Sequence, residues 1–144
     1  MSSEAVFAEL GARSHYSFLE GTASPRALVA AAARRGIGAL GLCDRNGLYG
    51  AVTFMAAARD AGIHPIIGAE LDLTDGSRLR FLARDRTGYR QLCRTISLAQ
   101  LAGAKGQPRL HVSGLTGDPP KDGDAVVEPG ALNACTVLAG GPQS

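Results

Sequence analysis

Short apolar runs alternate with amphipathic segments along the first hundred residues. The runs cover residues 7–10, 39–43, 64–71 and 79–83, and their length and composition are typical of β-strands. After the second run, Ala51, Phe54, Met55 and Ala58 recur at helical spacing and form one apolar face. Helices of ten or more residues between consecutive strands predict parallel β-α-β units. The fourth run is expected to be antiparallel or to lie at an edge.

Boundary residues and apolar faces together predict three helices. Ser24 followed by Pro25 predicts a helix start, and Gly36 predicts its end. Gly62 predicts the end of the second helix. A third apolar face is formed by Tyr89, Leu92, Cys93 and Ile96.

The composition changes near Gly103. Residues 115–124 read LTGDPPKDGD, and such clusters of proline, glycine and aspartate are typical of loops. The sequence therefore predicts a β/α region over residues 1–103. Residues 104–144 are expected to form an irregular, Gly/Pro-rich tail, which is also compatible with a truncated continuation of the same domain.

Composition narrows the class of protein. The chain has 144 residues, a formal net charge of +2 and 45% hydrophobic residues, as expected for one globular domain. No apolar run is long enough for a membrane span, and the first residues do not resemble a signal peptide. The three cysteines are far apart in the sequence. They predict reduced, mostly buried thiols and a cytoplasmic location rather than a disulfide framework.

Candidate functional residues cluster at the ends of the predicted strands. Functional groups in parallel sheets gather at the carboxyl ends, which here fall near residues 11–13, Asp44-Arg45 and Glu70. The glycines of the segment NGLYG at residues 46–50 lack the Gly-Lys-Ser/Thr of a phosphate loop. They are better interpreted as a turn that needs positive φ. No Ser-His-Asp or Cys-His-Asp spacing indicates nucleophilic catalysis.

Three segments resemble one protein family. Residues 7–21 read FAELGARSHYSFLEG, residues 39–54 read ALGLCDRNGLYGAVTF, and residues 62–71 read GIHPIIGAEL. They are similar to the PHP (polymerase and histidinol phosphatase) domain of bacterial C-family DNA polymerases, namely DNA polymerase III alpha subunits and error-prone DNA polymerases. A fourth, weaker match covers residues 82–92, so that the resemblance spans about residues 5–103. It implies an α/β fold that forms part of a PHP-type (β/α)7 distorted TIM-like barrel, with mostly parallel strands and alternating helices.

The resemblance also shows what this chain lacks. In active PHP domains, His, Asp and Glu side chains hold up to three divalent metals, which activate water for phosphoester hydrolysis. The matching histidine positions are Gly11, Arg13 and Arg45, whereas Asp44 and Glu70 remain. Glycine offers no ligand and a guanidinium has no lone pair to give. We therefore expect a degenerate metal site with no catalytic residue, no bound metal and no cofactor.

Two expectations concern the arginines. Asp44 and Glu70 are expected to point into the same cleft from adjacent strand ends. Arg13, Arg45 or both are expected to pair with one of these carboxylates and to take over the structural part of the metals' role, unless both side chains point to solvent. A basic segment with Asp85 as its only acid is a candidate for nucleic-acid contacts, although a solvated face is the favoured interpretation. This segment comprises Arg78, Arg80, Arg84, Arg86, Arg90 and Arg94.

The favoured interpretation is a non-catalytic PHP-like structural module of a polymerase III alpha-type or error-prone polymerase, serving DNA replication or repair. The chain itself is expected to be inactive, because nothing in it supplies the catalytic aspartates of a polymerase palm domain. Its expected partners are the remainder of a C-family polymerase or replication and repair proteins, with DNA as a further possibility and no membrane. Two alternatives stay open: a PHP metal-dependent phosphoesterase or 3′-5′ exonuclease, and a stand-alone nucleic-acid- or protein-binding module.

Overall fold

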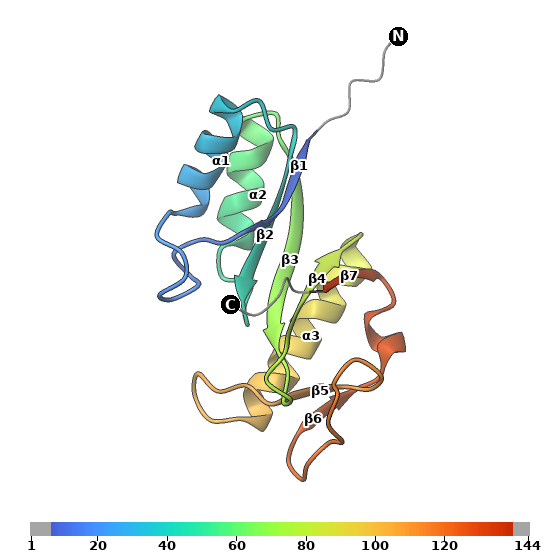
Figure 1. The fold of residues 1–144 in the computed structure, drawn as a ribbon. Coiled ribbons are helices and arrows are strands. Elements are labelled where there is room, and N and C mark those ends of the chain that lie inside the picture. The colour runs from blue at the N-terminus through green and yellow to red at the C-terminus, as the bar shows by residue number, and fades with distance from the viewer. Residues whose placement is uncertain (1–6, 140–144) are drawn as a thin grey trace.

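The computed structural model describes residues 7–139 and contains a five-stranded sheet, a two-stranded sheet and three α-helices (Figure 1). The elements in order are β1 (Ala8–Ala12), α1 (Pro25–Arg34), β2 (Ala39–Arg45), α2 (Ala51–Asp60), β3 (His64–Asp72), β4 (Arg78–Ala83), α3 (Arg86–Ala102), β5 (Leu110–Val112), β6 (Ala125–Val127), the 3-10 helix η1 (Pro129–Leu132) and β7 (Cys135–Ala139). The larger sheet has the order β1-β2-β3-β4-β7 and is curled like half of a barrel.

The large sheet is mixed rather than mostly parallel. β1, β2 and β3 are parallel neighbours joined through α1 and α2, as predicted. β4 runs antiparallel to β3, as expected for the fourth run, and β7 runs antiparallel to β4, so that two of the four pairings in the sheet are antiparallel. The reason is the short connection between β3 and β4, which closes on Gly76 at φ 85°. A connection of this length cannot cross over to a parallel strand.

Local sequence signals set the helix boundaries. Ser24 caps α1, because its side chain accepts a hydrogen bond from the Ala27 amide at 3.1 Å. Gly36 and Gly62 follow α1 and α2 with φ of 70° and 72°, a conformation that glycine adopts without strain. Asp85 caps α3 by accepting from the Gly88 amide at 2.9 Å. The first helix thus begins and ends, and the second ends, close to where the sequence predicts.

The two faces of the large sheet differ in character. One face is packed against the helices and contributes Leu42, Ile67 and Phe81 to the apolar core. Strand alternation places Cys43, Gly68, Arg45 and Glu70 on the other face. Burial raises the pKa of the Cys43 thiol to about 12. All three cysteines are free thiols.

The segment after Gly103 is made of short elements, but it is not separate from the sheet. β5 and β6 form the small parallel sheet, and β7 then pairs with β4 along residues 135–139. The compositional change at Gly103 therefore lies inside one structural unit. The remainder of the predicted tail, residues 140–144, lies outside the described residues. Between residues 7 and 139, no helix is both long and apolar enough to cross a membrane.

Candidate functional site

The strand register brings the candidate residues into one row. Arg45 of β2 lies opposite Glu70 of β3, and Glu70 lies opposite Arg80 of β4. Two residues further along β3, Asp72 lies opposite Arg78 of β4. Directly opposed residues of neighbouring strands share a face. Acidic and basic side chains therefore alternate across the helix-free face, where the carboxyl ends of β1, β2 and β3 meet.

Glu70 lies at the centre of this row. Its side chain is only 5% exposed. Its Oε2 accepts hydrogen bonds from Arg13 Nη2 at 2.6 Å and from Arg80 Nε at 3.1 Å. Arg78 Nη1 lies 3.7 Å from the other oxygen, Oε1. Three guanidinium groups therefore surround one buried carboxylate, and the expected pairing of Arg13 with Glu70 is present.

Two further carboxylates complete the cluster. Glu20, from the loop after β1, binds Arg13 at 3.0 Å, Arg45 at 3.3 Å and Arg78 at 2.9 Å. Asp72 binds Arg45 Nη2 at 2.6 Å and Arg78 Nε at 3.0 Å. We refer to these seven residues as the arginine–carboxylate network. Its members are Arg13, Glu20, Arg45, Glu70, Asp72, Arg78 and Arg80.

The sequence predicted only part of this network. Glu20 and Asp72 were missed, because neither position matches a metal ligand of the family. Arg45 pairs with Asp72 and Glu20 instead of Asp44 or Glu70. Arg78 and Arg80, expected as nucleic-acid contacts, bind carboxylates. The alternation of charge in β4 and at the end of β3 is the signal that could have revealed these pairs.

Gly11 explains how Arg80 enters the network. A Cβ atom at position 11 would lie 2.7 Å from Arg80 Nη1, which is closer than real Cβ contacts. Position 11 has no side chain, so the guanidinium can lie against its backbone. The guanidinium of Arg80 therefore fills the space beside a position where the resemblance places a histidine. Together with Arg13 and Arg45, it puts a guanidinium at or beside each of the three positions where the resemblance implies a histidine.

Asp44 has a different environment from Glu70. Its side chain accepts hydrogen bonds from the Ser14 amide, Ser14 Oγ and Ser17 Oγ, each at 2.7 Å. Because Arg45, and not Asp44, lies opposite Glu70, Asp44 points to the other side of β2. The expectation that Asp44 and Glu70 share one cleft was therefore wrong, since a one-residue step along a strand reverses the side chain.

Asp44 fixes the loop of residues 14–21. Ser14 and Ser17 are almost fully buried, and Ser17 Oγ also accepts from the Arg45 amide at 3.0 Å. The loop closes tightly at Gly21, where a Cβ would lie 2.2 Å from the Ser14 carbonyl oxygen. This closed loop places Glu20 within ion-pair distance of Arg13, Arg45 and Arg78. Asp44 thus acts as a structural anchor for the part of the network that comes from the loop.

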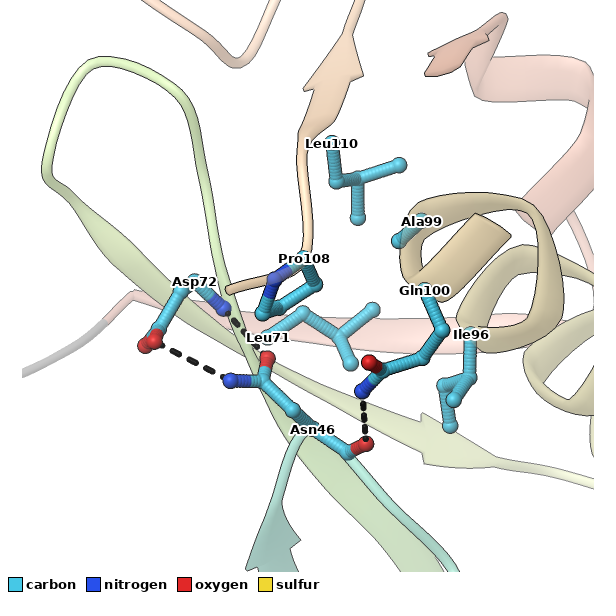
Figure 2. Close-up of a pocket in the computed structure, with 8 residues that line it drawn as sticks. All are labelled: Asn46, Leu71, Asp72, Ile96, Ala99, Gln100, Pro108 and Leu110. Carbon is cyan, nitrogen blue, oxygen red and sulfur yellow. Dashed lines mark hydrogen bonds between the residues drawn. The ribbon is translucent and has the colours of Figure 1, made fainter. Parts of the chain in front are cut away.

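Asn46 joins the end of β2 to β3 and α3. Its side chain donates to Asp72 Oδ2 and accepts from the Asp72 amide, both at 3.0 Å, and its carbonyl accepts from Gln100 at 3.3 Å (Figure 2). The pocket beside it has no space for a water molecule. Asn46 adopts φ 53°. The positive φ expected of the glycines in this turn therefore falls on asparagine, which tolerates that conformation.

The carboxylates of Asp44 and Glu70 are not arranged to bind a divalent metal. Metal ligation by a carboxylate needs free lone pairs and a site without competing cations. Glu70 instead accepts from two guanidinium groups, and Asp44 is occupied by serine donors. Within residues 7–139, no group of three or more His, Cys, Asp or Glu residues is arranged to hold a metal ion.

The pKa of Asp72 gives the network a pH dependence. Burial raises this pKa, but hydrogen bonds from Arg45 and Asn46 outweigh burial and leave it below its ordinary value. A lowered folded-state pKa stabilises the fold above the unfolded pKa, about 3.9, and this stabilisation is lost as pH falls through the folded pKa. We expect the melting temperature to drop below about pH 4. The Asp72→Asn variant should show a shallower drop in thermal melts across this range. An unchanged slope would mean that Asp72 is not charged in the network.

The family model described as "PHP domain" matches residues 9–118, and the chain belongs to this family. It is homologous to part of the error-prone DNA polymerase of Methylococcus capsulatus, with 50% identity over 109 residues. The corresponding polymerase of Mycobacterium tuberculosis is 44% identical over 127 residues. The aligned regions cover 76% and 81% of this chain but only 10% and 12% of those polymerases.

Solved structures share the fold at lower identity. A Bifidobacterium adolescentis protein assigned as a metal-dependent phosphoesterase superposes with a TM-score of 0.55 at 18% identity. An amidohydrolase from Chromobacterium violaceum, with bound sulfate and no metal, gives 0.56 at 23% identity. Each match covers 66% of this chain and about a third of the other, 33% and 34%. These similarities establish the fold and do not extend to activity.

Proposed function

We propose that this chain is a non-catalytic PHP domain that serves as a structural module of an error-prone-type DNA polymerase, in the cytoplasm. In this proposal the curled sheet is one side of a distorted barrel, and its partners are the other domains of such a polymerase. The relatives named as error-prone DNA polymerases support this assignment. Because the aligned part is about a tenth of their length, polymerisation itself is proposed for the larger protein and not for this chain.

The observation that carries the non-catalytic role is the environment of Glu70. A metal-dependent hydrolase needs a carboxylate whose oxygens are free to bind the metal. Here the Glu70 Oε2 atom lies 2.6 Å from Arg13 Nη2 and 3.1 Å from Arg80 Nε. A dication at this position would meet several fixed positive charges. The network neutralises Glu70 without a metal and holds β1, β3 and β4 together.

The alternative function is hydrolysis of phosphate esters. It is tested because the B. adolescentis neighbour is described as a metal-dependent phosphoesterase. We expect no release of phosphate from p-nitrophenyl phosphate, and no removal of 3′ nucleotides from DNA, with magnesium, manganese or zinc. Glu70→Ala should equal the unchanged chain in this assay, because neither has activity to lose. Metal-dependent turnover that Glu70→Ala abolishes would contradict the proposal and favour a PHP phosphoesterase.

A further inference from the structure

Four arginines of the basic segment lie outside the arginine–carboxylate network. None of the ion pairs among the described residues includes Arg84, Arg86, Arg90 or Arg94. All four are exposed. Arg84 donates to the Asn133 carbonyl, which uses one of its five N–H groups. The structure thus divides the basic segment into paired and unpaired arginines.

Three of these arginines form a stripe along α3. Arg86, Arg90 and Arg94 are separated by four residues each, so they lie on one side of the helix with a rise of about 6 Å per step. The buried residues of α3, which include Leu92 and Ala99, lie on other sides of the helix and pack into the core. We call these three residues the arginine stripe. All three side chains are exposed to solvent.

Helix stability does not explain this arrangement. Cations favour the carboxyl end of a helix and are unfavourable near the amino end, and like charges four residues apart repel. α3 has no acidic residue in its first turn and no basic residue in its last turn, so that these turns lack the charges that stabilise a helix. Asp85 already accepts a hydrogen bond from the Gly88 amide in the first turn. The positive charge on this surface therefore comes from the arginine side chains and not from free helix amides. The stripe concentrates positive charge that takes part in none of the ion pairs among the described residues.

We infer that the arginine stripe binds the phosphate backbone of duplex DNA, without sequence preference. Guanidinium groups at regular spacing suit phosphate oxygens, which they contact with paired donors. The aromatic residue of α3, Tyr89, is half-buried, so α3 offers no exposed ring on which an unpaired base could stack. The contact is therefore to the backbone and not to bases. This surface is separate from the network, and the inference does not depend on the absence of metal.

The test uses the full chain and a fluorescein-labelled DNA duplex of random sequence, with binding followed by anisotropy over a series of salt concentrations. The test variant is Arg86→Gln/Arg90→Gln/Arg94→Gln. The matched control is Arg26→Gln/Arg34→Gln/Arg35→Gln, which removes the same charge from exposed positions on and beside α1. Circular dichroism melts confirm that both variants are folded. Poly-glutamate serves as a competitor that represents an acidic protein surface.

Each neutralised phosphate contributes about −0.9 to the slope of log affinity against log salt. The α3 variant should lose at least about tenfold in affinity at low salt, and its slope should become less negative by about 2.7, three contacts at about 0.9 each. The α1 control should keep both the affinity and the slope. Equal losses in the two variants would reduce the effect to net charge and overturn the inference. So would the absence of binding by the unchanged chain, or poly-glutamate competition as strong as that of unlabelled duplex.

Discussion

Asp44→Ala is expected to lower the free energy of unfolding by about 3–5 kcal/mol. The change removes the acceptor for three hydrogen bonds of 2.7 Å and leaves the buried hydroxyls of Ser14 and Ser17 without it. A hydrogen bond to a charged group contributes about 1.5–3 kcal/mol, and each abandoned buried polar group costs about 1–3 kcal/mol, although these terms are not additive. Urea unfolding followed by circular dichroism measures the change.

Two further variants separate the anchor role from a general effect of charge. Asp60→Ala, at the exposed end of α2, should change the free energy of unfolding by less than about 0.5 kcal/mol. Asp44→Asn should fall between the two, because the amide oxygen still accepts from Ser14 or Ser17. If Asp44→Ala were as mild as Asp60→Ala, the loop of residues 14–21 would not depend on Asp44.

Glu70→Ala is expected to cost about 2–4 kcal/mol. Removing one partner of a buried charge cluster leaves the others uncompensated, and such losses reach about 3–5 kcal/mol in fully buried pairs. Here the side chains of Arg13, Arg78 and Arg80 that would remain are 27%, 34% and 29% exposed, so that solvent reduces the penalty. Glu70→Gln should cost less, because it keeps the side-chain shape and one acceptor. Unfolding experiments at low and high salt measure both variants.

The control for Glu70 is Glu9→Ala on β1, where the side chain is exposed and accepts only from the nearby Gly11 amide. It should change stability by less than about 0.5 kcal/mol. If Glu70→Ala stabilised the fold instead, the three arginines would be compensated by Glu20 and Asp72 alone. The network would then not depend on its central carboxylate.

The sequence predicted the elements better than their assembly. Apolar periodicity and the caps at Ser24 and Gly36 placed the helices, because these signals act within a few residues. The sheet partner of β7 was not predicted. Pairing between residues 79–83 and 135–139 depends on contacts distant in the sequence, and no local pattern encodes it. The antiparallel orientation of β4, in contrast, agrees with the expectation for the fourth run.

At the site, the loss of histidines could be predicted and the replacement only in part. Arg13 stands at a lost ligand position, and its pairing with Glu70 follows from that position. Arg80 enters from a different strand into space that Gly11 leaves open, which a linear motif does not reveal. Asp44 was expected beside Glu70, because adjacent strand ends suggested convergence. The register of β2 and β3 decides otherwise, since it depends on one residue.

The central claim is that the arginine–carboxylate network occupies the place of a metal centre. The most direct test is the metal content of the purified full chain after incubation with excess zinc, manganese or iron and removal of unbound ions. Inductively coupled plasma mass spectrometry should then find metal far below one ion per chain, both in the unchanged chain and in Glu70→Ala. Close to one ion per chain, lost in Glu70→Ala, would contradict the claim and show that the site still functions as a metal centre.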